Sequence, residues 1–456
     1  MATLVEKIWN AHRAATTSSG ADLIAIDRIF LHERTGAAAL KSMAAAKRRV
    51  RDPARVFVGV DHIVDTRPGR SDATLMPGGQ GFITETREAA RAAGLTIFDV
   101  TDRDQGIVHV ISPELGIVLP GCTLVAPDSH TCTQGAFGSL AWGIGSSEAE
   151  HAMVTGMLRL SRPKTMRIRL DGRLSAGVTA KDLALALLAR FGAGGGGGHA
   201  VEYAGSAVAA LDLEARMTLC NMATEFAAFT GIIAPDEAAF AALAGRRYAP
   251  QAFDSPYWQS LCSDPDAIFD VELSHDASSA APMVSWGTSP EHSIAVTANV
   301  PQGPARAHEY IGLAPGTPIA GTPIDVAFIG SCTNSRLSDL RRAATLLQGR
   351  HIAPGIKRAL VVPGSSAVKR AAEAEGLHHI FAAAGFEWRE SGCSLCFYAG
   401  GEGFSPGSRT ISSTNRNFEG RQGPGIRTHI ASPETVAASA IAGVIADPRN
   451  IAGALT

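Results

Sequence analysis

One pattern recurs along this chain: a short apolar run typical of a β-strand, then a polar cluster, then a helix-like stretch. The run "VFVGV" leads into Asp61-His62, "TLVAP" leads into Asp128, and "DVAFIGS" leads into Cys332. Strands that alternate with helices indicate parallel sheets, so the sequence predicts an α/β fold. Ligands bind beyond the carboxyl ends of strands in such sheets, which is where the polar clusters fall.

The composition predicts a folded chain with a large core. Hydrophobic residues make up 45% and charged residues 18% of its 456 residues. A formal net charge of −2, without a long basic run, argues against nucleic acid as a partner. There is no apolar run of about 18 residues, so no membrane span is expected. The N-terminus, with Glu6, lacks the plan of a signal peptide, and we expect a cytoplasmic protein.

The predicted boundary between two lobes lies in the segment 270–310, which is rich in Pro, Gly and Ser and is interpreted as a connector. We expect an N-terminal lobe of residues 1–285 and a C-terminal lobe of residues 286–456. The five-glycine run at 194–198 predicts either a flexible loop or a backbone that approaches a ligand closely. After Cys332 we expect a helix with Asn or Ser at its start and Asp339 in its first turns.

The pair Cys393-x-x-Cys396 has three interpretations. A zinc ribbon needs a second pair of ligands at similar spacing, and the chain has no other C-x-x-C. A redox dithiol needs only the pair itself. A cluster site needs one more cysteine at a strand end, and Cys332 is the candidate. Three thiolates can hold three corners of a [4Fe–4S] cube, leaving one iron open as a Lewis acid.

The remaining cysteines are interpreted as small core residues, because a free cysteine is among the most buried residue types. They are Cys122, Cys132, Cys220 and Cys262. Seven cysteines in a chain of this length do not form a disulfide framework.

Six motifs, in order along the chain, resemble those of the aconitase superfamily. They are "DSHTCTQGAFGSLAWGIGSSEAEH", "GHAVEYAGSAV", "RMTLCNMATEF…GIIAPDE", "IGSCTNSRLSDLR", "GCSLC" and "STNRNFEGRQGPGIRTH". Within the superfamily the similarity is closest to the large subunits of 3-isopropylmalate dehydratases (isopropylmalate isomerases). It runs through essentially the whole chain.

The resemblance implies three intertwined α/β/α domains around a [4Fe–4S] cluster. Residues 1–285 would form domains 1 and 2, and residues 286–456 would form domain 3 with the cluster cysteines. The family's fourth, swivelling domain would belong to a separate small subunit, so a heterodimer is expected. That subunit would also supply the Ser that removes the carbon-bound proton. Within this chain the candidates are Ser412 and Ser413, but they match a loop on the cluster side, which is the wrong side of the substrate.

The resemblance also implies roles for single residues. Cys332, Cys393 and Cys396 would be the cluster ligands. Asp61 would polarise His62, and the imidazole would protonate the leaving hydroxyl, as a cationic His can near neutral pH. His109 and Asp128 would form a second His–carboxylate pair. His130 would contact the substrate hydroxyl, and Glu202 would hold an iron-bound water. The substrate-binding residues would be Ser129, Asn415, Arg416 and Arg421.

The implied activity is that of a hydro-lyase acting on a small hydroxy di-acid. It would convert 2-isopropylmalate to 3-isopropylmalate in leucine biosynthesis by dehydration and rehydration. Ile63, where the family usually has Asn, and the aromatic stretch that begins at Phe397 depart from the family pattern. They keep related substrates open, such as 2-methylmalate/citraconate or dimethylmalate. Two other classes also remain: an RNA-binding cluster protein, which the near-neutral charge argues against, and a zinc or redox protein.

Overall fold

The computed structural model describes residues 1–251, 255–399 and 401–451. The chain forms two compact units, and each combines segments that are distant in the sequence. Unit 1 consists of Met1–His62, Gln80–Gly172 and Gly196–His275, and unit 2 consists of Ile63–Gly79, Arg173–Gly195 and Asp276–Thr456. These units are defined by contacts, whereas the predicted lobes 1–285 and 286–456 follow the family's domains and stay a prediction.

Unit 1 is built around a five-stranded parallel sheet. Its strand order is β5 (Thr96–Phe98), β4 (Val56–Gly59), β3 (Arg28–His32), β6 (Thr123–Ala126) and β7 (Leu140–Gly143). All three strands at its centre are buried along most of their length. Because β3 lies between β4 and β6, the residues that follow these three strands are neighbours at one edge.

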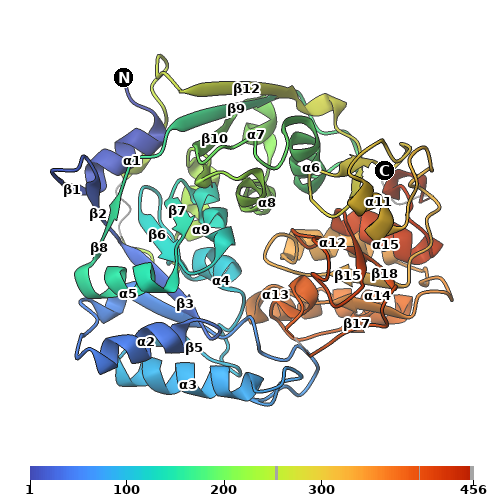
Figure 1. Cartoon of the computed structure of the whole chain (residues 1–456), viewed down its shortest axis with the longest axis horizontal. Helices are drawn as coiled ribbons and strands as arrows, with labels where there is room; N and C mark the ends of the chain where they lie inside the picture. The colour runs from blue at the N-terminus through green and yellow to red at the C-terminus, as the bar shows by residue number, and fades with distance from the viewer. Residues whose placement is uncertain (252–254, 400, 452–456) are drawn as a thin grey trace. The chain divides into compact units, whose positions relative to one another are not determined.

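Helices and two further sheets complete unit 1. The helices are α1 (Leu4–His12), α2 (Gly36–Ala45), α3 (Gly79–Ala92), α4 (Val108–Leu115), α5 (Ser146–Thr155), α7 (Ser206–Ala210), α8 (Leu213–Asn221), α9 (Glu237–Leu243) and α10 (Ser255–Gln259). One sheet has the order β11 (Thr230–Ile232), β10 (Ala200–Ala204), β9 (Thr165–Asp171) and β12 (Val271–Asp276), and Figure 1 shows β9 and β12 running side by side. The other has the order β1 (Arg13–Thr16), β2 (Asp22–Ala25) and β8 (Met157–Leu160).

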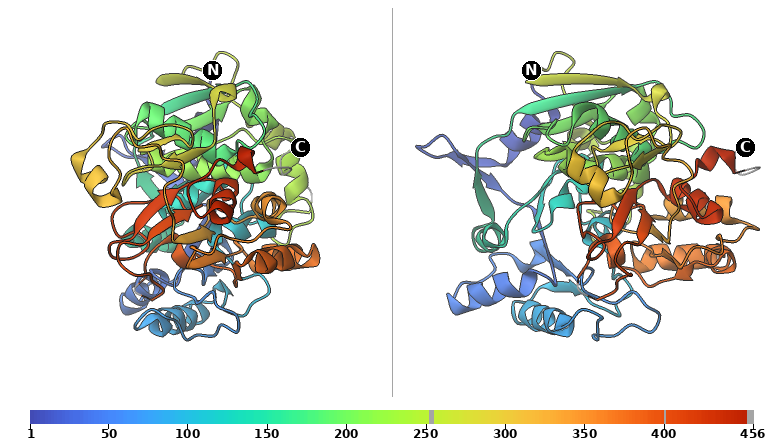
Figure 2. Two further views of the ribbon diagram at one scale, coloured as in Figure 1. Left: turned by 90° about the vertical axis from the view of Figure 1, so that its right-hand side faces the viewer. Right: turned by 45° about the vertical axis from the view of Figure 1, so that its right-hand side comes forward.

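Unit 2 contains a second five-stranded parallel sheet. Its order is β17 (Glu387–Trp388), β16 (Arg358–Val361), β15 (Val326–Ile329), β18 (Arg409–Ser412) and β19 (Arg427–Ile430). The helices of the unit are α6 (Ala180–Phe191), α11 (Ala305–Ile311), α12 (Leu337–Leu347), α13 (Ser366–Ala374), α14 (Leu377–Ala384) and α15 (Pro433–Ala442). Figure 2 shows the strands and helices of the C-terminal part, in orange and red, from two further sides. The predicted α/β class is confirmed in both units.

The helix predicted after Cys332 is present as α12, but its start differs in detail from the prediction. Asp339 lies in its first turn, and its carboxylate accepts a hydrogen bond from the backbone N–H of Arg336 at 3.1 Å. No Asn or Ser side chain caps this helix, because Arg336 occupies the N-cap position.

The segment 270–310 is not only a connector. It contains the antiparallel pair β13 (Met283–Ser285) and β14 (Ser293–Ala295) and most of α11. The backbone N–H of Met283 donates to the buried carboxylate of Asp182 at 2.8 Å. The segment therefore forms ordered structure in part, and a buried side chain of unit 2 satisfies one of its backbone N–H groups.

The glycine run approaches the chain's own backbone. Gly196 N–H donates to the carbonyl of Phe226 at 2.7 Å, and Gly198 N–H donates to that of Ala227 at 2.8 Å. A Cβ at Gly196 would lie 2.6 Å from the Phe226 carbonyl oxygen, so a larger residue does not fit.

In the described part of the chain, no helix is long and apolar enough to cross a membrane.

Candidate functional site

Three neighbouring strands of the unit 1 sheet end in acidic and imidazole side chains. β3 ends at His32, Asp61 and His62 come two and three residues after β4, and Asp128 comes two residues after β6. The strand order β4-β3-β6 brings these ends together. This is the arrangement that the polar clusters predicted at the ends of parallel strands.

His62 lies between two carboxylates. Its Nδ1 is 2.8 Å from Asp61 Oδ1, and its Nε2 is 3.2 Å from Asp128 Oδ2. Burial alone lowers the pKa of His62, but the Asp61 charge and hydrogen bonds to both carboxylates outweigh it, raising that pKa well above 6.5. The imidazole is therefore a cation near neutral pH, as a general acid requires.

Asp61 is stabilised as an anion by both its neighbour and a helix start. Its second oxygen accepts from the backbone N–H of Val108, the first residue of α4, at 3.0 Å. Burial favours the neutral acid, but the His62 charge and the hydrogen bonds from His62 and Val108 lower the pKa of Asp61. A carboxylate at a helix N-terminus is favoured by the helix dipole.

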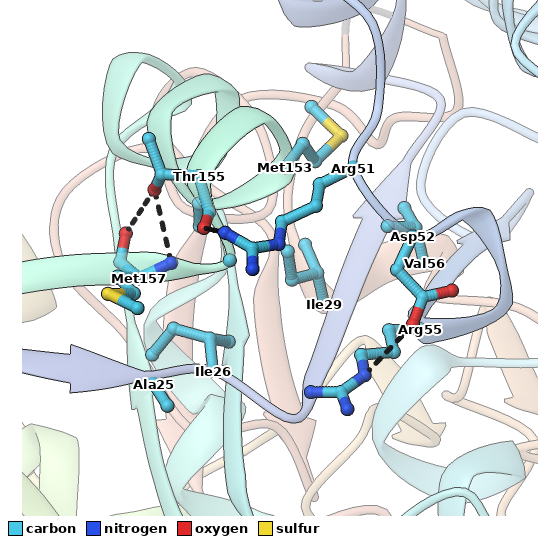
Figure 3. A pocket seen from close by; sticks show the side chains of 12 residues that line it. Ala25, Ile26, Ile29, Arg51, Asp52, Arg55, Val56, Met153, Thr155 and Met157 are labelled. Carbon is cyan, nitrogen blue, oxygen red and sulfur yellow. Dashed lines mark hydrogen bonds and ion pairs between the residues drawn. The ribbon is translucent and has the colours of Figure 1, made fainter. Parts of the chain in front are cut away.

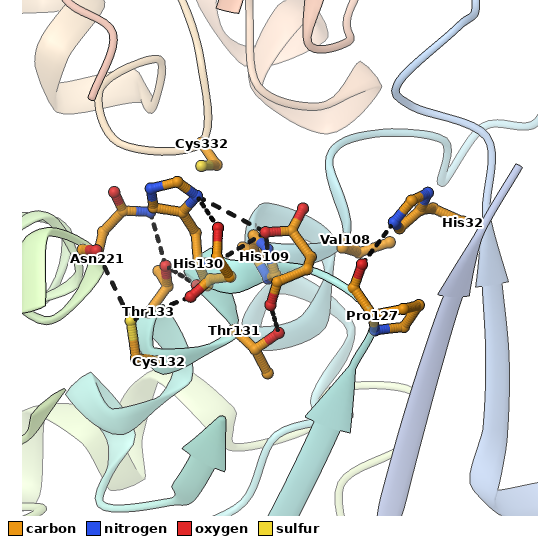
Figure 4. A network of polar contacts seen from close by, with 12 residues as sticks. His32, Val108, His109, Pro127, His130, Thr131, Cys132, Thr133, Asn221 and Cys332 are labelled. Carbon is orange, nitrogen blue, oxygen red and sulfur yellow. Dashed lines mark hydrogen bonds and ion pairs between the residues drawn. The ribbon is translucent and has the colours of Figure 1, made fainter. Parts of the chain in front are cut away.

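Asp128 joins two further histidines to this group. Its Oδ1 is 3.2 Å from His109 Nε2, and it accepts from the backbone N–H of His130 at 2.7 Å. Figure 4 shows His109 and His130 in one network of polar contacts. Burial raises the pKa of Asp128, but the charge of His109 and hydrogen bonds from three histidines lower it well below 3.8. The predicted pairing of His109 with Asp128 is present.

Glu225 is a member of this group that the sequence interpretation missed. It belongs to the 3-10 helix η3 (Met222–Phe226), and its Oε1 is 2.8 Å from His130 Nε2. From α8 beside it, the amide of Asn221 donates to Thr133 Oγ1 at 2.8 Å. Both residues stand in the quoted motif "CNMATEF", which marks the segment but does not reveal which side chains it faces.

Glu202 is held elsewhere in unit 1. Its carboxylate accepts from Ser263 Oγ at 2.6 Å, and no contact with the histidine group is found in the described part of the chain. Burial is the main reason that its pKa is raised, with Ser263 acting in the opposite sense. The geometry therefore gives Glu225, and not Glu202, a contact with His130.

In unit 2 the three predicted cluster cysteines are all buried and not in disulfides. Cys332 follows β15, and Cys393 and Cys396 lie in the loop between β17 and β18. Asn415, which follows β18, lies between two of the sulfurs: its amide donates to Cys332 Sγ at 3.5 Å, and its Oδ1 is 3.9 Å from Cys396 Sγ. The parallel strands β15 and β18 are neighbours, which places their carboxyl ends side by side.

The backbone at these cysteines adopts conformations that side chains disfavour. Ser331, before Cys332, has φ 91°, and Ser394, after Cys393, has φ 46°. Such strain persists only where the surroundings hold it, and it is enriched at functional sites. One of the supports is the buried Arg336, whose guanidinium donates to the carbonyls of Cys332 and Thr333, each at 2.7 Å.

Arg421 lies beside the thiols. Its Nη2 is 3.6 Å from Cys396 Sγ, and its guanidinium stacks on the ring of Phe397 at 5.8 Å. No carboxylate pairs with Arg421 among the described residues. Arg416, one residue after Asn415, is half-buried. Arg427, further along the chain, donates to the Tyr310 carbonyl at 3.1 Å.

The donor set fits an iron–sulfur cluster better than a single metal ion. Three sulfurs that share one zinc ion lie about 3.8 Å apart, given Zn–S bonds of about 2.3 Å. The sulfurs of Cys332, Cys393 and Cys396 do not all lie within 4.8 Å of one another. Wider spacing suits three corners of a cluster, and the Asn415 amide and the Arg421 guanidinium are suitable donors to anionic sulfur.

Of the other cysteines, three follow the prediction and one does not. Cys122, Cys132 and Cys220 are buried, and burial raises the pKa of the Cys132 thiol to about 12. Cys262 is exposed, so its assignment to the core was wrong. It lies in a turn after α10, between Leu261 and Ser263, where only Leu261 is buried in the core.

A cavity of about 400 Å³ lies at the amino edge of the unit 1 sheet, where β3 and β4 begin. Figure 3 shows the two arginines that line it. Arg51 donates to the Thr155 carbonyl at 2.8 Å, and Arg55 pairs with Asp52 at 3.1 Å. Both guanidinium groups thus have partners, and the cavity lies at the opposite strand ends from His62.

The comparisons with known proteins agree with the geometry. A model of the aconitase family (aconitate hydratase) matches residues 6–443. The 3-isopropylmalate dehydratase large subunit 1 of Bradyrhizobium diazoefficiens is 50% identical over 464 aligned residues, which cover 98% of this chain and 97% of the relative. The chain belongs to the aconitase family.

Proposed function

We propose that the chain is the large, cluster-binding subunit of a 3-isopropylmalate dehydratase. It acts as a hydro-lyase that converts 2-isopropylmalate to 3-isopropylmalate by dehydration and rehydration, as a cytoplasmic enzyme of leucine biosynthesis. The observation that carries the chemistry is the buried set of Cys332, Cys393 and Cys396 with Asn415 between two of the sulfurs. The 50% identity to a 3-isopropylmalate dehydratase large subunit supports the substrate.

The three cysteines are the proposed ligands of a [4Fe–4S] cluster. Bound through three thiolates, such a cluster supplies a Lewis acid toward a hydroxyl and a carboxylate. The chain's own part is to keep the sulfurs anionic. Asn415 and Arg421 provide hydrogen-bond donors to Cys332 Sγ and Cys396 Sγ, and Arg336 fixes the carbonyl of Cys332.

His62 is the proposed general acid of the dehydration. Asp61 holds the Nδ1–H of the imidazolium, so the proton on Nε2 is the one delivered to the departing hydroxyl. Asp128 faces Nε2 at 3.2 Å and orients the ring until the substrate binds. Without such an acid the leaving group is hydroxide, which is a poor leaving group at neutral pH.

His130 and Glu225 form the second proton-carrying pair of the proposal. His130 is the proposed contact for the substrate hydroxyl, and Ser129 Oγ lies 3.4 Å from its Nδ1. Glu225 fixes His130 Nε2 at 2.8 Å. We assign to Glu225 the water-binding role expected of Glu202, because the carboxylate of Glu202 is hydrogen-bonded to Ser263.

Arg421 and Arg416 are the proposed clamps for the substrate carboxylates. A guanidinium binds a carboxylate with two parallel hydrogen bonds, which fixes the di-acid in one orientation. Arg421 suits this role because its planar group lies over Phe397 and beside Cys396, without a carboxylate partner in the described part of the chain. Phe397 then lies next to a bound di-acid.

The base that removes the carbon-bound proton is proposed to come from a small subunit with the family's swivelling domain. Two serines beside Asn415 are the alternatives within this chain. Ser413 Oγ hydrogen-bonds the Gly330 carbonyl at 3.0 Å, and Ser412 Oγ hydrogen-bonds Thr414 Oγ1 at 3.0 Å. Both hydroxyls are buried and support the loop, which makes them poor bases.

Two residues that depart from the family pattern support a second candidate class of substrates. Ile63 follows the general acid and Phe397 follows a cluster cysteine, and both side chains are buried. Different side chains at these positions would change the wall of the proposed substrate pocket, and with it the alkyl group that fits. The alternative substrates are therefore 2-methylmalate/citraconate or dimethylmalate.

The test is turnover by the purified two-subunit complex across a panel of hydroxy and unsaturated di-acids. We expect the highest kcat/KM with 2- and 3-isopropylmalate. In Ile63→Asn and Phe397→Ala complexes, an unchanged ranking of substrates shows that the departures do not set specificity. Higher kcat/KM for 2-methylmalate or dimethylmalate in the unmodified complex overturns the isopropylmalate assignment while keeping the hydro-lyase.

A further inference from the structure

His32 lies at the centre of the unit 1 strand ends, yet no role in the proposed reaction has been given to it. It is the last residue of β3, the strand between β4, which leads to Asp61 and His62, and β6, which leads to Asp128. Its side chain is 3% exposed. The residue therefore sits between the two segments that hold the general acid.

His32 contacts both segments. Its ring stacks on the His62 ring, with centroids 4.0 Å apart and planes at 19°. Its Nε2 is 3.1 Å from the carbonyl oxygen of Pro127, the residue before Asp128, and Figure 4 shows this contact. A carbonyl only accepts, so the Nε2 of His32 carries a hydrogen and donates it.

The charge states of the two rings differ. Burial first, and then the neighbouring His62 charge, lower the pKa of His32 to about 4, so its ring is neutral near neutral pH. The ring of His62 is the cation. A neutral ring stacked on a cationic one avoids the repulsion between two like charges and covers one face of the imidazolium.

The contacts of His62 leave a defined task for such a neighbour. Asp61 and Asp128 both bind the edge of the His62 ring, at Nδ1 and Nε2. These two contacts act in the plane of the ring, whereas a flat group against the face resists tilting of the plane through the side-chain torsions of His62. His32 supplies such a group, because its ring stacks on that of His62 with centroids 4.0 Å apart.

The residue after His32 supports the same element. The carboxylate of Glu33 accepts from the backbone N–H of Asp61 at 3.1 Å. Thr86 Oγ1 in turn donates to the Glu33 carbonyl at 3.1 Å. The dipeptide at the end of β3 thus braces the backbone before His62 as well as its ring.

We propose that His32 is a positioning residue for the general acid, holding the plane of the His62 ring through the stack and the Asp128 segment through Pro127. The inference rests on the proposed function in one respect only, the assignment of His62 as the acid. A misplacement of about 1 Å at a catalytic group costs about 100-fold in rate. Loss of the stack is therefore expected to lower kcat and to leave KM unchanged.

Two variants separate the stack from the hydrogen bond. His32→Phe keeps a flat ring and loses the donor to Pro127, and His32→Gln keeps a donor and loses the ring. We expect kcat to fall about 10- to 100-fold in His32→Gln and less than about 10-fold in His32→Phe, with KM within about twofold in both. The control is His151→Gln, on the exposed part of α5, which should match the unmodified complex.

A second readout needs no substrate. In the full chain with ¹⁵N-labelled histidine rings, His62 should show two slowly exchanging ring N–H signals at pH 7, one toward each carboxylate. These signals should persist in His32→Phe and be lost to exchange with water in His32→Gln. Folding of each variant is checked by circular dichroism, and the His32 pair is compared only when both are folded.

Three results overturn the proposal. They are an equal or smaller loss of kcat in His32→Gln than in His32→Phe, a rise in KM that accounts for the loss, and His62 signals that survive in His32→Gln. If the unmodified complex turns over none of the di-acids, the proposed function fails. The ring signals then still decide whether His32 holds His62.

Discussion

His62 and Asp128 stabilise each other's charged forms. Their contributions to the stability of the fold are therefore lost at opposite ends of the pH scale. The raised pKa of His62 means that its contribution to stability is present below about pH 6.5 and is lost as the pH rises through the raised folded pKa. The lowered pKa of Asp128 means that its contribution is present above about pH 3.8 and is lost as the pH falls through the folded pKa. Between these limits the pair is fully charged.

Replacing the acid tests its role directly. His62→Ala should keep the cluster and lower kcat by about two to four orders of magnitude, which is the usual contribution of a positioned general acid. Asp61→Asn should also lower kcat, since the imidazolium loses the carboxylate at Nδ1. Steady-state rates and iron content measure the two effects. A near-normal rate in His62→Ala points instead to His130 as the acid.

Asp128→Asn tests the electrostatic part of the account. The substitution removes the negative charge that lies beside His62 Nε2, so the pKa of His62 should fall. The alkaline limb of the pH–rate profile, where the acid loses its proton, should then move to lower pH. An alkaline limb at the unmodified position would show that Asp128 does not set the charge of His62.

At the scale of single residues, most members of the histidine–carboxylate group of unit 1 were predicted. Asp61, His62 and Asp128 lie together, as polar residues that follow neighbouring parallel strands should, and His109 and His130, which the family resemblance implied, lie beside Asp128. Glu225 was missed because one Glu in a motif does not reveal which His it faces. Cys262 was placed in the core on residue type alone, which ignores the turn that exposes it.

Among the elements, the strand–loop–helix units at the cysteines carry the strongest local constraint. β15 leads through Ser331 and Cys332 into α12, and the loop carries a positive φ and a buried guanidinium. The order of strands β15 and β18 then fixes which loops meet. The sequence predicted β15 and α12, but not β13 and β14, because stretches rich in Pro, Gly and Ser look alike whether or not tertiary contacts order them.

Cysteine substitutions test the ligand set. Cys332→Ser, Cys393→Ser and Cys396→Ser should each abolish cluster binding, because two thiolates then remain. Cys122→Ser and Cys220→Ser are matched controls in unit 1 and should keep full iron content. Iron and sulfide analysis decides the matter, and a Cys332→Ser chain with four irons would refute the assignment. A colourless chain with stoichiometric zinc would favour the single-metal alternative.

The buried guanidinium of Arg336 is expected to support the loop at Cys332. Arg336→Met removes the two hydrogen bonds that the guanidinium donates to the carbonyls of Cys332 and Thr333, which should lower the free energy of unfolding by roughly 1–3 kcal/mol. Denaturant unfolding measures it. Arg341→Met is the control on the same helix, since Arg341 and its partner Glu375 are exposed and exposed pairs contribute little. Equal losses in the two variants would contradict the support role.

Across the whole molecule, both units use the same construction. Each presents polar side chains beyond the carboxyl ends of a five-stranded parallel sheet, histidines and carboxylates in unit 1 and thiols with arginines in unit 2. The proposed reaction needs an acid, a Lewis acid, carboxylate clamps and a base. In the proposal His62 is the acid, Arg416 and Arg421 are the clamps, and the three cysteines hold the Lewis acid, while the base is assigned to a small subunit.

The account is tested most directly by adding that subunit to the cluster-loaded chain under anaerobic conditions and following the conversion of 2-isopropylmalate. We predict no turnover by the chain alone. Activity should rise with added small subunit and saturate at one per chain, with the cluster content constant throughout. Substantial turnover by the chain alone would contradict the account, because the base would then lie within these 456 residues.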